Sequence, residues 1–274
     1  MNISTGWVGF FDILGYANLL KRNEPETIAQ EVVPLLTDTE HEAIKGIGIF
    51  FDDVAIQIRS DVKNSQLEAE DFPKFVADLK WLLFSDTILI AMPTHESTGG
   101  QSILRWLTFF IACNMLQVKL FRTGLPLRGA IDFGRFFIKD TCFAGRPIIN
   151  AYELCNMLEL AACVLSPEAS DQLHRHKPLL DGHSLDALVL EYLVPTKGGE
   201  RHFFVTRASV HEKNIDIRKQ VMKAFWGHRK DISIDAQKKA TNTQQWLRYL
   251  DHLEEKKAAQ QKPAADVLPP GADA

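Results

Sequence analysis

The stretch Val8-Gly-Phe-Phe-Asp-Ile-Leu-Gly-Tyr16 places a carboxylate, Asp12, inside an apolar, strand-like run. A second run, Trp81-Leu-Leu-Phe-Ser-Asp-Thr-Ile-Leu-Ile90, places Asp86 in the same way. A charge inside a β pattern must be compensated, and two such charges on neighbouring strands are most simply compensated by bound divalent cations. This pair of aspartates is therefore the candidate functional site.

The composition predicts a folded globular protein with a full hydrophobic core. The chain has 274 residues, of which 46% are hydrophobic, and this size fits one enlarged domain or one domain with an appendage. The net charge of -4 and the sequence pI near 6.1 give no electrostatic footprint for a nucleic-acid backbone or an anionic membrane. We therefore expect neither nucleic acid nor a membrane as a partner.

The cysteines and the apolar segments indicate a reduced, cytoplasmic protein. Cys113, Cys142, Cys155 and Cys163 show no Cys-x-x-Cys spacing and lie in apolar runs, so we expect them to be small buried hydrophobes. The N-terminus lacks the basic region and long apolar stretch of a signal peptide. Basic and amide side chains interrupt the most apolar segment, residues 103–121, which therefore predicts a buried helix and not a membrane span.

Strand and helix patterns alternate along the chain and predict a compact α+β sheet domain. The predicted strands cover residues 7–14, 80–84, 87–92, 127–133, 135–139, 163–165, 187–194 and 202–206, with hairpin turns at 85–86, near 134 and at 197–199. The predicted helices cover residues 24–39, 101–122 and 148–162, a brief helix capped by Ser166, and further helical segments between 212 and 255.

Three regions follow from this pattern. Residues 1–210 form the predicted sheet domain, with an extra segment at 40–75 in which residues 47–58 fit either a strand or a helix. Residues 211–257 form a predicted C-terminal helical extension. Residues 258–274 are rich in Ala, Gln and Pro and predict a disordered tail.

The two aspartates, placed at one edge of such a sheet, suggest phosphoryl chemistry. Two carboxylates can bridge two cations roughly 3.5 to 4 Å apart, which activates an attacking oxygen and stabilises a leaving phosphate. Gly15, just after Asp12, would let phosphate oxygens approach the backbone N–H groups at the start of the next helix. Arg128 lies in a predicted strand opposite this region and could neutralise a triphosphate.

Each of these residues also has a structural interpretation. A single aspartate at a strand end is more often a cap or turn residue than a ligand, and Arg128 fits a salt-bridged strand arginine equally well. Other patterns give weaker hypotheses: an incomplete dinucleotide fingerprint at Gly46-Ile-Gly48, an acidic pair at Asp52-Asp53, and histidines without acid at ligand spacing at His174, His176 and His183.

Four motifs together resemble the class III nucleotidyl cyclases. Phe10-Phe-Asp-Ile-Leu-Gly-Tyr16 is similar to the first metal-binding motif of that family, and Phe84-Ser-Asp-Thr-Ile88 to the second. Leu127-Arg-Gly-Ala-Ile-Asp-Phe-Gly134 resembles the strand whose arginine contacts the triphosphate, and Phe143-Ala-Gly-Arg-Pro-Ile-Ile-Asn-Ala151 resembles the approach to the next helix. The motifs occur in family order across residues 7–166, which is far more specific than any one of them.

This resemblance implies a fold, an assembly and a set of site residues. The implied fold is a ferredoxin-like, palm-type antiparallel sheet with helices on one side, in a head-to-tail homodimer with active sites at the interface. Asp12 and Asp86 become ligands of two divalent cations, Mn²⁺ or Mg²⁺, with the backbone of Ile13 as a third ligand. The implied substrate contacts are Arg128 at the phosphates, together with Phe10, Phe11, Ile13, Leu14, Gly15, Tyr16 and Asn150.

The chain departs from purine cyclases in ways that bear on its substrate. Ile149 and Glu153 stand where those enzymes carry a transition-state asparagine and arginine, and the base-reading aspartate expected near Cys142 is absent. The forms Ser-Asp-Thr and Asn-Ala-Tyr-Glu-Leu resemble the Pycsar pyrimidine cyclases of bacterial anti-phage defence. That resemblance implies conversion of UTP to cyclic UMP, which would act on a separate effector protein.

Three alternatives to a uridylate cyclase stay open. Asn150 offers both a donor and an acceptor and does not separate uracil from cytosine, so a cytidylate cyclase is the nearest. An inactive cyclase-like module that binds a nucleotide or a partner is favoured by the missing asparagine and arginine, but the retention of both aspartates, Asp12 and Asp86, argues against it. A diguanylate-cyclase-like or polymerase-palm enzyme is disfavoured, because the chain lacks the Gly-Gly-Asp/Glu-Glu-Phe sequence and an extended basic groove.

Overall fold

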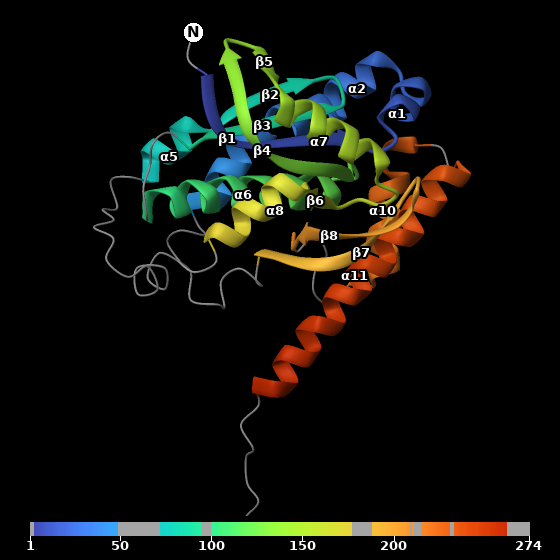
Figure 1. The fold of residues 1–274 in the computed structure, drawn as a ribbon. Helices are drawn as coiled ribbons and strands as arrows, with labels where there is room; N and C mark the ends of the chain where they lie inside the picture. Colours follow the sequence, from blue (N-terminus) through green and yellow to red (C-terminus); the bar gives the residue numbers. More distant parts are fainter. Residues whose placement is uncertain are drawn as a thin grey trace, which may run out of the picture.

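A mixed eight-stranded sheet organises the chain in the computed structural model (Figure 1). The structure describes residues 3–48, 72–94, 100–176, 188–208, 210, 215–230 and 233–261. The strand order is β2-β3-β1-β4-β6-β8-β7, and β5 pairs with β4. The strands are β1 (Ile3–Ile13), β2 (Lys80–Phe84), β3 (Thr87–Pro93), β4 (Leu127–Lys139), β5 (Cys142–Gly145), β6 (Cys163–Leu165), β7 (Val189–Thr196) and β8 (Gly199–Thr206).

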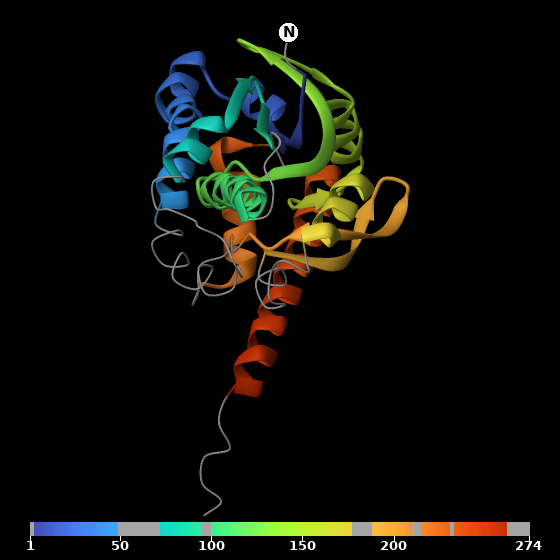
Figure 2. The ribbon, with the colours of Figure 1, turned by 60° about the vertical axis from the view of Figure 1, so that its left-hand side comes forward.

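Helices cover both faces of this sheet (Figures 1 and 2). They are α1 (Tyr16–Arg22), α2 (Pro25–Glu31), α3 (Val33–Thr37), α5 (Phe72–Asp78), α6 (Gly100–Arg122), α7 (Arg146–Met157), α8 (Pro167–His176), α10 (Ile217–Trp226), the 3-10 helix η3 (Gly227–Arg229) and α11 (Ile234–Gln261). Residues 39–48 are also helical. The C-terminal part of α11 extends away from the rest of the molecule in both views.

The central strand β1 divides the core into two layers. Trp7 and Phe11 lie in one buried cluster with α6, whereas Val8 and Phe10 lie in the other with α7 and α11. This alternation follows from the two-residue period of a strand, which sends neighbouring side chains to opposite faces. Because both faces of β1 are buried from Gly6 to Phe11, this part of the strand is apolar, and the charged residue that follows it, Asp12, needs a partner.

The helix α6 fills the layer on one face of the sheet. By length and composition, the segment Ser102–Arg122 is apolar enough to cross a membrane, with a mean hydropathy of 1.3. However, 83% of this apolar stretch is buried inside the structure, where it packs against β1 and β3. The apolar composition of α6 is therefore explained by its place in the core, as the sequence predicts.

The strand order confirms the predicted α+β fold with a ferredoxin-like core. The chain runs from β1 through α1–α3 to the β2–β3 hairpin and then through α6 to β4, which gives the order β2-β3-β1-β4. Helices α1, α3 and α6 share one core cluster with β1, so the helices of this core lie on one side. The sheet is not antiparallel throughout, because β6 pairs with β4 in parallel, and α7 covers the second face.

One predicted hairpin is wrong. The strand β4 runs without a break through Gly134, and the turn lies further on, at residues 140–141, where Asp140 has a positive φ of 52°. At Gly134 a Cβ atom would lie 2.9 Å from Cγ of Pro147. Glycine at this position therefore allows α7 to pack closely on β4. The sequence alone does not distinguish a glycine with this role from a glycine in a turn.

Three predicted helix boundaries also differ from the structure. The segment 24–39 is divided into α2 and α3 near Val32, where Pro34 begins a new helical turn. The helix predicted over 148–162 ends at Met157, because Leu158 is extended and bridges to Thr196 of β7. The helix α11 continues to Gln261, past the predicted boundary at residue 257, and residues 262–274 lie outside the described residues.

The other predicted elements are confirmed. The structure contains the β2–β3 hairpin, the long helix α6, the short strand β6 and the β7–β8 hairpin. Ser166 caps α8, since its hydroxyl accepts the backbone N–H of Ala169 at 3.0 Å. The helix α1 begins directly after Gly15, whereas the sequence predicts the next helix at residues 24–39. Residues 49–71, which include Asp52-Asp53 and most of the ambiguous 47–58 stretch, lie outside the described residues.

Candidate functional site

Asp12 and Arg128 form an ion pair between β1 and β4. The strand register sets the two residues opposite each other, and Arg128 Nε donates to Asp12 Oδ2 at 2.7 Å. Arg128 Nη2 also donates to Asn156 Oδ1 of α7 at 2.9 Å. The side chains of Arg128 and Asp12 are only 13% and 20% exposed. The salt-bridged arginine, which the sequence left open, is thus the arrangement in this structure.

Asp86 lies beside this pair at the tip of the β2–β3 hairpin. Thr87 is the register partner of Asp12, and the backbone N–H of Ile13 donates to the carbonyl of Asp86 at 3.0 Å. Among the described residues, the half-buried Asp86 side chain has no hydrogen bond or ion pair. The structure therefore brings the two predicted carboxylates together at one end of adjacent strands.

The charge of Asp12 is incompletely compensated in this arrangement. Burial raises the pKa of Asp12, and the pairing with Arg128 opposes this rise without cancelling it. The nearby charge of Asp86 raises the pKa of Asp12 further, while Lys239 of α11 lowers it. Two carboxylates of like charge in a partly buried place favour an additional cation.

The donor set fits a hard divalent cation, although with few protein ligands. The carboxylate oxygens of Asp12 and Asp86 are ligands of the kind that Mg²⁺ and Mn²⁺ prefer, and a backbone carbonyl, predicted here for Ile13, is another. Within the described ranges, no cluster of three or more His, Cys, Asp or Glu side chains is able to hold a metal ion. Any cation here would therefore depend on water or on substrate phosphate for its remaining ligands.

The predicted contacts after Asp12 are mostly buried. Leu14 and Tyr16 are buried in the two core clusters, and burial together with the charge of Asp86 raises the pKa of Tyr16. Gly15 adopts the left-handed conformation, with φ of 81°, which permits the sharp entry into α1. Because α1 has only 7 residues, we assign no anion site to its N-terminus.

The two phenylalanines before Asp12 face opposite layers. Phe10 contacts Tyr152 of α7 edge-on, with ring centroids 5.3 Å apart, on the face that carries Arg128. Phe11 is fully buried against α6, and a Cβ atom on Gly129 would lie 2.4 Å from its ring. Phe11 can therefore contribute to a ligand site only through its backbone.

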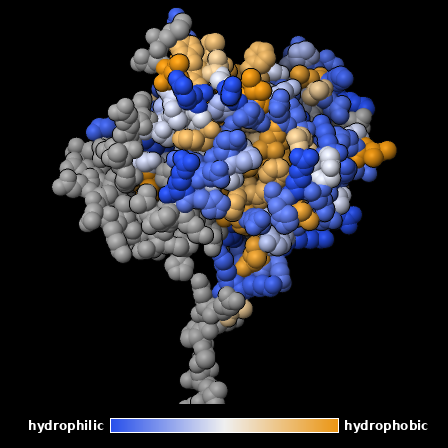
Figure 3. Space-filling model, viewed as in Figure 1, coloured by the Kyte–Doolittle hydropathy of each residue, from blue (hydrophilic) through white to orange (hydrophobic). Residues whose placement is uncertain are grey.

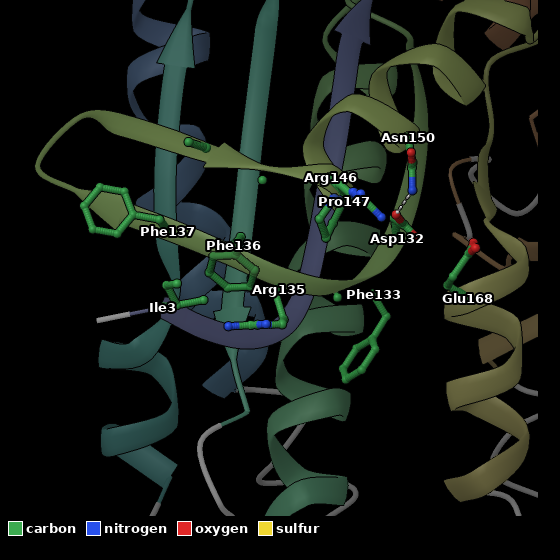
Figure 4. Close-up of a pocket in the computed structure, with 13 residues that line it drawn as sticks. Ile3, Asp132, Phe133, Arg135, Phe136, Phe137, Arg146, Pro147, Asn150 and Glu168 are labelled. Atoms are coloured by element: carbon green, nitrogen blue, oxygen red, sulfur yellow. Dashed lines mark hydrogen bonds between the residues drawn. The ribbon is translucent and has the colours of Figure 1, made fainter. Parts of the chain in front are cut away.

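Asn150 lies in a separate cleft, close to a third buried carboxylate (Figure 4). Its Nδ2 donates to Asp132 Oδ2 at 2.9 Å, and the Ser166 hydroxyl donates to Asp132 Oδ1. Burial raises the pKa of Asp132, although these hydrogen bonds lower it. The cleft has a volume of about 880 Å³ and is lined by β4, β5 and the first turns of α7 and α8. Asn150 and Asp12 are thus not brought together within one chain.

Several residues near Asp12 were missed by the sequence reasoning. Asn156 orients Arg128, Tyr152 contacts Phe10, and Lys239 contributes positive charge. None of these carries a sequence signal, because each lies on a helix face whose neighbour is set by tertiary packing. Asp132 did carry one, since it is an aspartate inside an apolar strand, as Asp12 is.

A buried lysine, Lys230, lies against Gly15. Its ammonium donates to the carbonyls of Gly124 at 2.6 Å and Ala224 at 2.9 Å, and its Cδ lies 3.2 Å from the position of a Cβ atom on Gly15. Burial lowers the pKa of Lys230 to about 7. The segment between α10 and α11 is thereby fixed beside the start of α1.

We expect Lys230 to make the protein more stable as the pH rises above 7. In the unfolded chain a lysine keeps its proton to a pH near 10.4, whereas folded Lys230 loses it near pH 7, so the unfolded state binds more protons between these values. The free energy of unfolding should rise by roughly 1 to 2 kcal/mol from pH 7.0 to 8.5. Urea titrations at both pH values measure this rise. The rise should disappear in Lys230→Met and should remain in Lys219→Met, which changes an exposed lysine. An equal rise in Lys230→Met would contradict the assignment.

The cysteines and histidines form no second site in the described residues. Cys113, Cys155 and Cys163 are buried as predicted, and burial raises the pKa of Cys155 to about 12, which disfavours a thiolate. Cys142 is exposed at the start of β5, which corrects the prediction of a buried residue. His174 packs edge-on against Phe204, and His183 lies outside the described residues.

Comparison with known proteins gives distant structural matches. No protein-family model and no curated protein matches the chain. The guanylate cyclase domain of RhGC from Catenaria anguillulae, in complex with GTP, matches at 12% identity and a TM-score of 0.42, covering 76% of this chain and 99% of that chain. Adenylate cyclases from Trypanosoma brucei match at 11% identity and a TM-score of 0.43, covering 76% of this chain and 92% of that chain. A bacterial light-regulated adenylyl cyclase matches at 9% identity and a TM-score of 0.44, covering 80% of this chain and 55% of that chain. These scores are too low to support a function.

Proposed function

We propose that the chain is a class III nucleotidyl cyclase that converts UTP to 3',5'-cyclic UMP and pyrophosphate. The observation that carries this proposal is the adjacency of the Asp12 and Asp86 carboxylates on β1 and at the β2–β3 turn, beside Arg128. Three oxygen donors next to a guanidinium suit a cation-bound polyphosphate. The ordered motifs around these residues then favour nucleotide cyclisation among phosphoryl transfers.

The reaction forms one bond and breaks one. The 3'-oxygen bonds to the α-phosphorus, the bond from that phosphorus to the oxygen bridging to the β-phosphate breaks, the hydroxyl proton passes to solvent, and pyrophosphate leaves. Bound Mn²⁺ or Mg²⁺ would activate the 3'-hydroxyl and stabilise the developing charge. Asp12 and Asp86 would hold the cations with Ile13, and Arg128 would orient Asp12 while screening the phosphates.

The proposed base specificity rests on two residues of α7, and the proposed assembly rests on exposed hydrophobic side chains. Ile149 and Glu153 replace the polar pair of purine cyclases, which favours a pyrimidine substrate, with CTP as the alternative. Ile149 is 57% exposed on α7, and Tyr152 and Phe84 are also exposed. Hydrophobic residues reach the surface among hydrophilic ones on the face shown in Figure 3. Such side chains suit the proposed homodimer, whose partner subunit would complete the site.

The product would act as a messenger in anti-phage defence, in the cytoplasm, on a separate effector protein. This part of the proposal rests on the Ser85-Asp-Thr87 and Asn150-Ala-Tyr-Glu-Leu154 motifs alone. A cyclic nucleotide needs a receptor protein, and the proposal places that receptor on a separate chain.

One observation favours a second function, an inactive module that binds a nucleotide and regulates. Arg128 pairs with Asp12 without any bound cation, so the two residues would be retained for stability even if catalysis were lost. In that case Asp86, which has no partner among the described residues, would be free to vary without consequence. Its behaviour therefore separates the two functions.

Product analysis tests the proposed function directly. Purified protein is incubated with each of the four ribonucleoside triphosphates and Mn²⁺, and the products are identified by mass. Cyclic UMP from UTP is the expected result. Cyclic CMP would change the base assignment, whereas the absence of product from every triphosphate would reject the cyclase and leave the binding module.

A further inference from the structure

The Asp12–Arg128 pair lies close to a contact between two turns. The backbone N–H of Leu14, just after β1, donates to the carbonyl of Pro126, just before β4, at 2.9 Å. Leu14 follows Asp12 by two residues, and Pro126 precedes Arg128 by two residues. The first turn continues into α1, and the second follows α6. A shift of either turn would therefore displace a strand end that carries one member of the ion pair.

Lys230, in the segment 227–230 between α10 and α11, contacts both turns. Its Cδ lies 3.2 Å from the position of a Cβ atom on Gly15, in the first turn. Its ammonium donates to the carbonyl of Gly124, in the second turn, at 2.6 Å, and to that of Ala224 in α10 at 2.9 Å. Lys230 is only 5% exposed. Because a buried ammonium needs acceptors, these two carbonyls fix its place between the turns.

His228 makes a second connection to the same region. Its Nε2 lies 2.6 Å from the carbonyl oxygen of Thr123, and since a carbonyl oxygen only accepts, the ring nitrogen donates. The carbonyl of His228 accepts a hydrogen bond from Nδ2 of Asn23, at the end of α1, at 2.8 Å. The ring also packs on Gly124, where a Cβ atom would lie 3.1 Å from it. The segment 227–230 thus holds α1 as well as the turn after α6.

The backbone of this segment is strained. His228 and Arg229 have positive φ angles of 53° and 58°, a left-handed conformation that is costly for residues other than glycine. Such strain persists only where the surrounding contacts enforce it. We therefore expect the segment to relax away from the two turns if a contact of Lys230 or His228 is lost.

We propose that Lys230 and His228 are positioning residues for the Asp12–Arg128 pair, through which the C-terminal extension keeps the site in the shape that binds a divalent cation. The cation and its use in nucleotide cyclisation rest on the proposed function. The hold on the two turns rests on the contacts above, and it can be measured without a ligand.

Hydrogen exchange of backbone amides, followed by NMR on the full chain, tests this hold. The Leu14 amide should exchange at least about 10-fold faster in Lys230→Met, because its hydrogen bond between the turns opens more often. The Ser166 amide, which donates to a carbonyl of β4 at 2.8 Å, should change less than about 2-fold. The exposed control Lys219→Met should change neither amide. Equal acceleration of both amides, which marks a merely structural role, or no acceleration at Leu14 would overturn the proposal.

His228→Phe guards against a folding defect of Lys230→Met. It keeps an aromatic ring in place and removes the hydrogen bond to Thr123, so Leu14 should exchange about 3-fold faster or more. His252→Phe, at an exposed position of α11, should leave this exchange unchanged. Unchanged Leu14 exchange in His228→Phe would overturn the proposal even if Lys230→Met does not fold.

Calorimetric titration of Mn²⁺ into the same proteins tests the effect on the site. The dissociation constant should rise about 10-fold in Lys230→Met and His228→Phe, as for other residues that orient metal ligands, and stay within about 2-fold in both controls. Wild-type affinity in a variant with faster Leu14 exchange would overturn the proposal. If the wild-type protein binds no Mn²⁺ and forms no cyclic product, the proposed function is rejected, while faster Leu14 exchange in both variants still supports the hold on the ion pair.

Discussion

Asp86→Asn is expected to lower kcat/KM for cyclic UMP formation by at least about 10³-fold, while the melting temperature stays unchanged. The substitution keeps the shape of the side chain and removes the negative charge that a cation requires. No hydrogen bond or ion pair of the Asp86 side chain to another described residue is lost. Initial rates with UTP and Mn²⁺, with the product detected by mass, give kcat/KM. Thermal unfolding gives the melting temperature.

Asp140→Asn is the matched control for this change. Asp140 is also an aspartate at a hairpin turn, between β4 and β5, and it is exposed. Its substitution should leave both kcat/KM and the melting temperature within error. If Asp86→Asn retained activity within about 10-fold of wild type, Asp86 would not be a cation ligand, and the two-cation mechanism would fail with it.

The central sheet was predictable because its signals are local. The continuous apolar run from Trp7 to Phe11 indicates a buried strand, and Ser85-Asp86 indicates the hairpin turn. Gly134 shows where local reasoning fails. A glycine between two apolar runs suggests a turn, yet here it permits the close contact with Pro147, which depends on a helix that follows later.

The candidate site was predictable only in part, for the same reason. Asp12, Asp86 and Arg128 lie on adjacent strands, and their adjacency follows once the strand order is known. The partners Asn156 and Lys239 belong to helices whose packing no short pattern specifies. Asp132 has the same sequence signal as Asp12, but its hydrogen bonds to Ser166 and Asn150 satisfy it, so the signal alone does not separate a structural carboxylate from a ligand.

Asp12→Asn is expected to lower the free energy of unfolding by about 2 to 3 kcal/mol, in addition to abolishing turnover. Arg128 is mostly buried and would be left without its charged partner, so the cost comes chiefly from an uncompensated guanidinium. Arg128→Gln should be destabilising by a similar amount. Urea unfolding at pH 7 measures each value, and circular dichroism confirms that the variants fold.

The double variant Asp12→Asn/Arg128→Gln decides how much of this effect belongs to the pair. Because both charges are removed together, no buried charge remains unpaired. The free energy of unfolding of the double variant should therefore be about 1 to 3 kcal/mol higher than the value obtained by adding the two single effects. Additive effects would mean that Asp12 and Arg128 do not depend on each other, against the 2.7 Å contact. The double variant should nevertheless form no cyclic product, since restored stability does not restore a cation ligand. Activity in the double variant would show that Asp12 serves the fold alone.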